Sequence, residues 1–171
     1  MKHVLAVLVE NKPGVLARIS GLFSRRGFNI DSLVVGETLD PDISRMTITV
    51  TGDSSTLEQV VKQLNKLVNV IKISNITEDP AVIRELMLIK VQADPQTRSD
   101  IQQIVETFRG KVVDVSLDSL VIEITGDEQK LEAIKILLQH FGIKEVVRTG
   151  KVAILRGNKT TQEGSDGTVN S

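Results

Sequence analysis

The sequence predicts an α+β protein built from two consecutive copies of one six-element unit: strand, helix, strand, strand, helix, strand. Three observations support this: the strand and helix periodicities alternate in that order, the order returns after a short linker, and the later part of each half, from the Thr-Gly-Asp tripeptide through the second helix, aligns at one constant offset. Thr-Gly-Asp at 51–53 recurs at 125–127, and Leu64 aligns with Leu138. We expect two antiparallel sheets, each with its helices on one face, as in the ferredoxin-like fold.

The first copy begins with a continuous apolar run at residues 3–9, which is typical of a buried strand. A helix is expected next, between Pro13, which suits a first helical turn, and Gly27, a good stop signal. Its apolar stripe consists of Val15, Leu16, Ile19, Leu22 and Phe23.

A second strand is expected at residues 28–36, followed by an exposed connection at 36–44. Residues 45–52 then alternate between apolar and threonine side chains, which predicts a half-buried antiparallel strand with Thr47 and Thr49 on the open side. Asp53 or a neighbouring serine is expected to cap the next helix, and residues 69–76 close the unit as a fourth strand. That helix carries Leu57, Val60, Val61, Leu64 and Leu67 on one stripe.

The second copy repeats this order and sets the expected domain boundaries. We expect a first module at residues 1–78, a linker at 79–84 and a second module at 85–156. Residues 157–171 are polar and glycine-rich, have almost nothing to bury, and are expected to be disordered.

Composition excludes several classes of function. Lys and Arg number 21 and Asp and Glu 22, a net charge of −1, so no basic excess is available for nucleic acid. The chain has no cysteine, which excludes disulfides and thiolate metal sites. No apolar run is long enough to span a membrane and no secretory or organellar presequence is visible, so a cytoplasmic location is expected.

The junction of the first strand and helix is the candidate binding site. A glycine at a helix start lets another group approach the backbone, and the free N–H groups of Gly14, Val15 and Leu16 favour a carboxylate. The second strand is expected to lie beside the first, so that Asn29 could lie near Asn11 and both could offer amide oxygens to an ammonium group. An aliphatic floor of Ile30, Leu33 and Val35 completes an α-amino-acid site. The second copy has Asp94-Pro95-Gln96-Thr97 at the corresponding junction.

Local chemistry leaves two alternatives open. Asn11 could be only a turn residue and Gly14 only a tight corner, because strand-to-helix junctions commonly use such residues. Lys12 and Arg18 could instead indicate an acylphosphatase-like enzyme, although Arg18 lies one turn into the helix. His3 and His140 have no Glu or His at metal-ligand spacing, so no metal or catalytic residue is predicted.

The segments NKPGVL, SRRGFNIDSL, SRMTI and EDPAV occur here in that order. Together they resemble the small regulatory subunit of acetolactate synthase, whose first module is an ACT domain, and the likeness runs from residue 2 to about residue 156. Asn11, Gly14, Val15, Leu16, Asn29 and Ile30 all match the effector motif of that family. The second module, which is ACT-like in its strand order, lacks the motif.

The resemblance implies a non-catalytic chain that binds the large catalytic subunit, activates it and confers feedback inhibition by valine in branched-chain amino acid biosynthesis. It also implies a homodimer through paired ACT domains, with effector sites at the interface. Thiamine diphosphate, Mg²⁺ and FAD would belong to the catalytic subunit, and this chain would hold no cofactor. An ACT-type amino-acid sensor that controls another enzyme or regulator is the alternative, and leucine or isoleucine could replace valine.

Overall fold

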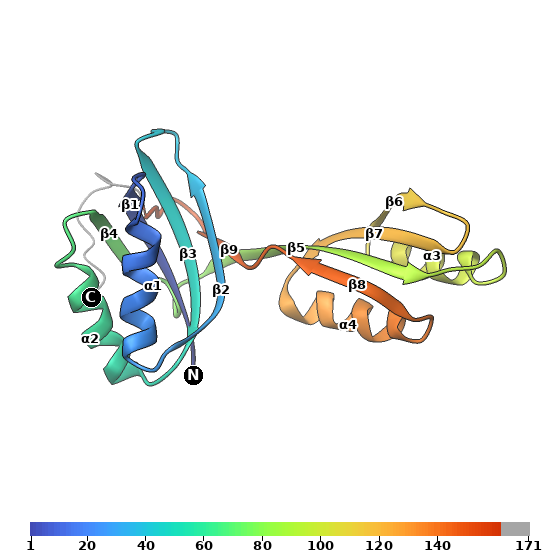
Figure 1. Ribbon diagram of the computed structural model, residues 1–171, viewed down its shortest axis with the longest axis horizontal. Coiled ribbons are helices and arrows are strands. Elements are labelled where there is room, and N and C mark those ends of the chain that lie inside the picture. The colour runs from blue at the N-terminus through green and yellow to red at the C-terminus, as the bar shows by residue number, and fades with distance from the viewer. Residues whose placement is uncertain (162–171) are drawn as a thin grey trace. The chain divides into compact units, whose positions relative to one another are not determined.

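The computed structural model describes residues 1–161 of the chain and shows two compact units. The first unit, Met1–Val82 with residues 151–161, contains the six elements predicted for the first module (Figure 1). They are β1 (Lys2–Glu10), α1 (Val15–Arg25), β2 (Asn29–Glu37), β3 (Ile43–Thr51), α2 (Ser54–Leu64) and β4 (Val70–Asn75).

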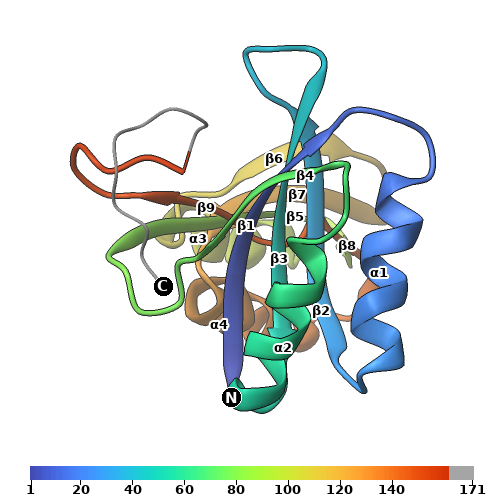
Figure 2. The ribbon, with the colours of Figure 1, turned by 90° about the vertical axis from the view of Figure 1, so that its left-hand side faces the viewer.

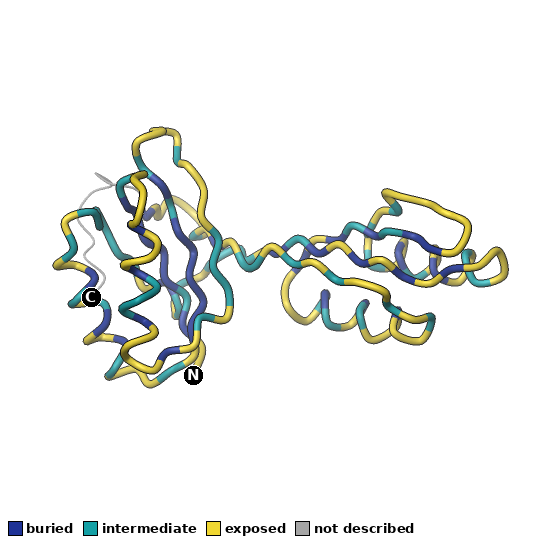
Figure 3. Tube along the Cα trace, in the orientation of Figure 1, coloured by how far each residue is buried: buried dark blue, intermediate teal, exposed yellow. Residues whose placement is uncertain are grey.

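The first sheet has the strand order β2-β3-β1-β4, and every neighbouring pair is antiparallel. Helices α1 and α2 lie against one face of this sheet (Figure 2). That face buries side chains from β1, β3 and both helices completely or almost completely, among them Leu5, Val7, Ile19, Phe23, Ile48 and Leu64. The dark stretches of Figure 3 follow the same central strands.

Local signals place the helix ends as the sequence predicts. Gly27 has φ +75°, a conformation that glycine adopts without strain, and it follows the last turn of α1. The predicted cap of α2 is confirmed, because an Asp53 carboxylate oxygen accepts from the Ser55 N–H at 3.4 Å. Phe23 and Phe28 meet edge to face across the end of α1, with ring centroids 6.2 Å apart.

The second unit, Ile83–Gly150, repeats the architecture with the sheet order β6-β7-β5-β8. The side chain of Asp127 accepts from the Lys130 N–H at 2.9 Å, so the aligned Thr-Gly-Asp tripeptides end in a helix cap in both modules. Its elements are β5 (Ala81–Gln92), α3 (Arg98–Thr107), β6 (Lys111–Val115), β7 (Ser119–Gly126), α4 (Glu128–Gln139) and β8 (Ile143–Arg148).

The chain differs from the sequence expectation at two places. Strand β5 already begins at Ala81, inside the expected linker 79–84. A further strand, β9 (Val152–Leu155), pairs with β5, and residues 151–161 belong to the first unit rather than to a module at 85–156. Of the tail expected to be disordered, 157–171, the part from residue 162 onward lies outside the described residues.

Thr47 and Thr49 are 3% and 1% exposed, so the expectation of a solvent-facing threonine side on β3 is wrong. The alternating pattern identified the two faces of the strand correctly, but Arg45 on the same face holds Ala153 and Thr161, which are distant in sequence, against it. No helix within residues 1–161 is long and apolar enough to cross a membrane.

Candidate effector site

The corner between β1 and α1 is open around Gly14. This residue has φ +85° and precedes the first residue of α1, and no side chain caps the helix. A Cβ built on Gly14 would meet no atom within 4 Å. Within the described chain the N–H groups of Gly14, Val15 and Leu16 donate no hydrogen bond. The first turn therefore presents unused donors at the positive end of a helix dipole, the arrangement that favours a carboxylate.

Asn11 borders this corner and is held in place by the β2–β3 connection. Its backbone N–H donates to the Asp42 carbonyl at 2.8 Å, and its Nδ2 donates to the Pro41 carbonyl at 3.0 Å. Both bonds use donors, so Oδ1 stays available as an acceptor toward an ammonium group. The sequence did not predict the contacts with Pro41 and Asp42. Turn residues indicate that the chain reverses there, but they do not specify which other segment the turn contacts.

The other two predicted residues lie at the opposite end of the sheet. Asn29 and Lys2 both pair with Thr51, whereas Glu10 pairs with Ile43. Because β3 lies between β1 and β2, those strands run parallel, and Asn29 lies roughly 25–30 Å along the strands from Asn11. The expectation that β2 lies beside β1 and brings these asparagines together is therefore wrong within one chain.

At its own end of β2, Asn29 is exposed and its Nδ2 donates to an Asp31 carboxylate oxygen at 2.8 Å. Asp31 is held in turn by Thr51 Oγ1, which donates to the other carboxylate oxygen at 2.6 Å. The bond to Asp31 uses a donor of Asn29, so its Oδ1 stays available as an acceptor, like that of Asn11. Ile30 and Leu33 pack against the core, and Val35 is 43% exposed.

Charges near the corner are already paired. Lys12 Nζ lies 2.9 Å from a Glu10 carboxylate oxygen. The hydrogen bond from Lys12, reinforced by one from Asn69, lowers the pKa of Glu10, and the same bond raises the pKa of Lys12. Arg18 Nη1 donates to Asn69 Oδ1 at 2.8 Å. The cations invoked for an acylphosphatase-like cradle are thus engaged with neighbours, and the donors left for an anion are backbone amides.

The second module closes the same corner with its own side chains. One Asp94 carboxylate oxygen accepts from the N–H groups of Gln96 and Thr97, both at 2.9 Å. These bonds, the one from Thr97 first, lower the pKa of Asp94. Arg98 Nη2 donates to the Leu117 carbonyl at 2.9 Å and to that of Ser116. A carboxylate therefore occupies the helix start of the second module, but it belongs to the chain itself.

The remaining candidate residues have structural roles. His3 is 2% exposed and its Nε2 lies 3.1 Å from the Gly52 carbonyl, and the His140 ring meets Phe141 edge to face. Within residues 1–161 no group of three or more His, Cys, Asp or Glu side chains is arranged to hold a metal ion.

Comparison with known proteins assigns the family. Two family models match the chain: an AHAS small subunit-like ACT domain at residues 5–72 and the small subunit of acetolactate synthase at residues 84–157. A probable acetolactate synthase small subunit of Archaeoglobus fulgidus is 60% identical over 93% of this chain and 99% of its own length. The chain belongs to the acetolactate synthase small subunit family.

Two further relatives support the assignment to this family. The small subunit of Mycolicibacterium smegmatis is 59% identical over 91% of each chain. The crystal structure of the Thermotoga maritima small subunit superposes with a TM-score of 0.85 at 46% identity and covers 93% of this chain and 99% of that one. The predicted α+β class, with an N-terminal ACT domain and a second module of the same strand order, is confirmed.

Proposed function

We propose that this chain is the regulatory partner of an acetolactate synthase catalytic subunit, which it binds and activates and to which it confers feedback inhibition by valine. The observation that carries the proposal is the uncapped start of α1 beside Asn11. Family membership supports the catalytic partner. The closed corner of the second module supports one effector site per chain.

A free α-amino acid suits the groups left unused at this corner. Its carboxylate would accept from the N–H groups of Gly14, Val15 and Leu16, and its ammonium group would donate to Asn11 Oδ1. Leu16 and Val35, each 43% exposed, supply aliphatic surface for a branched side chain. One methylene in such a pocket is worth about 1–3 kcal/mol, so leucine and isoleucine should bind with a different affinity without being excluded.

A second chain would supply Asn29 and Ile30. Strand β2 is an edge strand, with Asn29 at one end and Glu37 at the end nearer Asn11. Antiparallel pairing of β2 with β2 of a second chain would bring Asn29 of the partner subunit beside Glu37 and the corner. The six predicted residues would then form two equivalent sites across a two-fold axis, and a monomer would have none.

This arrangement gives valine a means to act at a distance. An effector shifts an equilibrium only by its different affinity for two states. Bound valine would fix the orientation of two first modules and thereby change how the pair sits on the catalytic subunit. Thiamine diphosphate, Mg²⁺ and FAD are proposed to belong to that catalytic subunit, and this chain contributes no group to the chemistry.

Co-purification with activity measurement tests the proposal. We expect a thiamine-dependent catalytic subunit from the same cell to co-purify with the chain, to gain activity from it and to lose activity when valine is added. If the chain binds valine but neither associates with nor activates that subunit, the alternative of an ACT-type sensor for another enzyme or regulator replaces this proposal.

A further inference from the structure

The sheet face opposite the helices in the first unit is unusually polar for a buried surface. On β3 the side chains of Arg45, Thr47 and Thr49 point to this face, while Met46 and Ile48 point to the helices. Thr49 is 1% exposed and its Oγ1 has no hydrogen-bond partner in the described structure. The polar side chains on this face of β3 would form hydrogen bonds with water, but another segment of the chain covers them.

The covering segment is residues 151–161, which we call the C-terminal strap. Its first residue, Lys151, donates its N–H to Ser32 Oγ on β2 at 2.8 Å. Arg45 holds it further along: Nη2 donates to the Ala153 carbonyl at 2.5 Å, and Nη1 donates to Thr161 Oγ1. Ala153 and Thr161 are 5% and 7% exposed, so both ends of the strap pack closely.

The contacts with the first sheet make the strap releasable from that sheet, while β9 stays paired with β5 and the Arg156 N–H with the Pro80 carbonyl. Arg45 is partly buried and forms no ion pair with any residue in 1–161; burial lowers its pKa, and neutral oxygens alone receive its hydrogen bonds. A partly buried cation without a counter-ion gains little from its position. The threonine face beneath loses hydrogen bonds to water when it is covered, as the unpartnered Thr49 shows.

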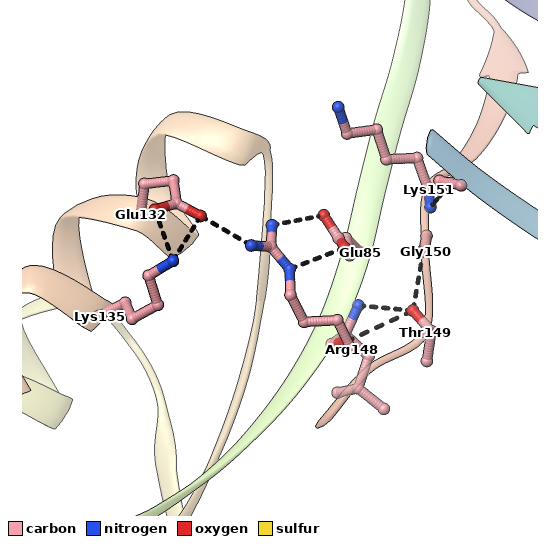
Figure 4. A network of polar contacts seen from close by, with 9 residues as sticks. Glu85, Glu132, Lys135, Arg148, Thr149, Gly150 and Lys151 are labelled. Carbon is pink, nitrogen blue, oxygen red and sulfur yellow. Dashed lines mark hydrogen bonds and ion pairs between the residues drawn. The ribbon is translucent and has the colours of Figure 1, made fainter. Parts of the chain in front are cut away.

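The strap is linked in both directions to parts that matter for regulation. Ser32 lies three positions after Asn29 on the edge strand β2. In the other direction, Lys151 follows Arg148 by three residues, and Arg148 makes a bidentate pair with Glu85, with both bonds at 2.9 Å (Figure 4). Arg148 also donates to Glu132 at 2.7 Å. Only Thr149 and Gly150 thus separate Arg148, with its ion pairs in the second unit, from the strap, whose first residue bonds to β2.

Arg45 also lies close to the effector end of the sheet. It pairs with Leu8 on β1 and with Gly36 on β2, two positions along β3 from Ile43, which pairs with Glu10. Any change in spacing of these strand ends when the corner is occupied would alter the Arg45 contacts on the opposite face.

We propose that the strap carries the effector signal from the first unit to the second, with Arg45 and Ser32 as positioning residues that hold it. The strap has an attached and a released state, and occupancy of the corner changes the balance between them. This inference rests on the proposed function, because it requires an effector-sensitive catalytic subunit. It assigns the inhibitory response to residues that touch no effector.

Arg45→Ala tests the proposal in the complete complex with the catalytic subunit. We expect the valine concentration for half-inhibition to rise at least about fivefold, the low end of ordinary allosteric coupling. Activation by the chain and the valine affinity of the isolated chain, measured by calorimetry, should both change by less than about twofold. Arg84→Ala is the matched control, because Arg84 is exposed and donates only to the neighbouring Ile83 carbonyl.

If the Arg45→Ala complex is half-inhibited at the same valine concentration as the unsubstituted complex, the proposal is overturned. A parallel fall in valine affinity of the isolated chain would also overturn it, because Arg45 would then shape the site itself. If Arg45→Ala does not fold, Ser32→Ala removes the hydrogen bond that joins the Lys151 N–H to β2 and is judged by the same outcomes. Absence of any valine effect on the unsubstituted complex is a separate result, which refutes the proposed function first.

Discussion

The two modules share one topology but treat the start of their first helix differently. In the first module, the amides at Gly14 and the next two residues are unused, and no side chain caps α1. In the second module, Asp94 covers the corresponding amides with its own carboxylate. In either module this corner is suited to a carboxylate. In the second module Asp94 supplies it, whereas in the first module it would have to come from a ligand.

The same contrast separates binding from stability. The second module is closed by the Asp94 turn that precedes α3 and by the bidentate Glu85–Arg148 pair, both of which serve its own fold. The first module keeps an αL glycine and an open helix end, features that add no stability and that suit the proposed binding site. Substitutions in each module should separate the two roles.

Gly14→Asp should abolish the valine response. Its carboxylate would stand at the helix start as Asp94 does in the second module, and it would repel the carboxylate of valine. We expect a folded chain that still activates the catalytic subunit, with the valine concentration for half-inhibition raised at least tenfold, about 1.4 kcal/mol or more.

Gly14→Asn is the matched control for this variant. Asparagine tolerates the φ of +85° about as well as aspartate and is similar in size, but it is uncharged. A much smaller loss of response than in Gly14→Asp is expected. Equal losses would attribute the effect to backbone strain rather than charge.

Asn29→His should weaken valine binding, because the imidazole would fill the position proposed for the ammonium group. Asn29 is exposed and lies far from Asn11 in its own chain, so the effect requires a second chain. We expect a several-fold weaker affinity in calorimetry, about 1 kcal/mol. An unchanged affinity would reject the role of Asn29 and the shared site.

Glu85→Gln should destabilise the second module and leave the first unaffected. Glu85 is 6% exposed, and a glutamine in its place can accept only one of the two bonds from Arg148, whose third bond to Glu132 remains. We expect the free energy of unfolding to fall by about 1–3 kcal/mol. Calorimetry should find valine affinity unchanged, and a parallel loss of affinity would show that the modules are not separable in this way.

Asp94→Ala should have the smallest effect, a lower unfolding midpoint with no change in valine response. Because hydrogen bonds lower the pKa of folded Asp94, its contribution is present above the unfolded pKa and is lost as pH falls through the folded pKa. The difference in midpoint between the variant and the unsubstituted chain should therefore shrink toward acid pH. A constant difference would show that the carboxylate charge is not what stabilises the turn before α3.

Much of the fold could be predicted because periodicity and caps are local. The repeat, both sheets and the Asp53 cap follow from spacing within about ten residues. Burial of Thr47 and Thr49 could not be predicted, because the strap that covers them lies about a hundred residues later and carries no signal of where it returns.

For the site, sequence identified the open corner at Gly14 but assigned Asn29 to the wrong end of one chain. The motif lists which residues contribute and does not say which chain supplies them. The strand order β2-β3-β1-β4 separates Asn11 from Asn29, and pairing of two edge strands is a property of the assembly. Asp94 could have been recognised, since an aspartate two and three residues before free amides is a common Asx turn.

A crystal structure of the chain with valine would show directly whether two chains share an effector site at the start of α1. We expect valine to bind at the start of α1. Its carboxylate should accept from the N–H groups of Gly14, Val15 and Leu16, and its ammonium group should lie between Asn11 of one chain and Asn29 of the partner subunit. An empty corner at saturating valine, or valine bound wholly within one chain, would contradict this expectation.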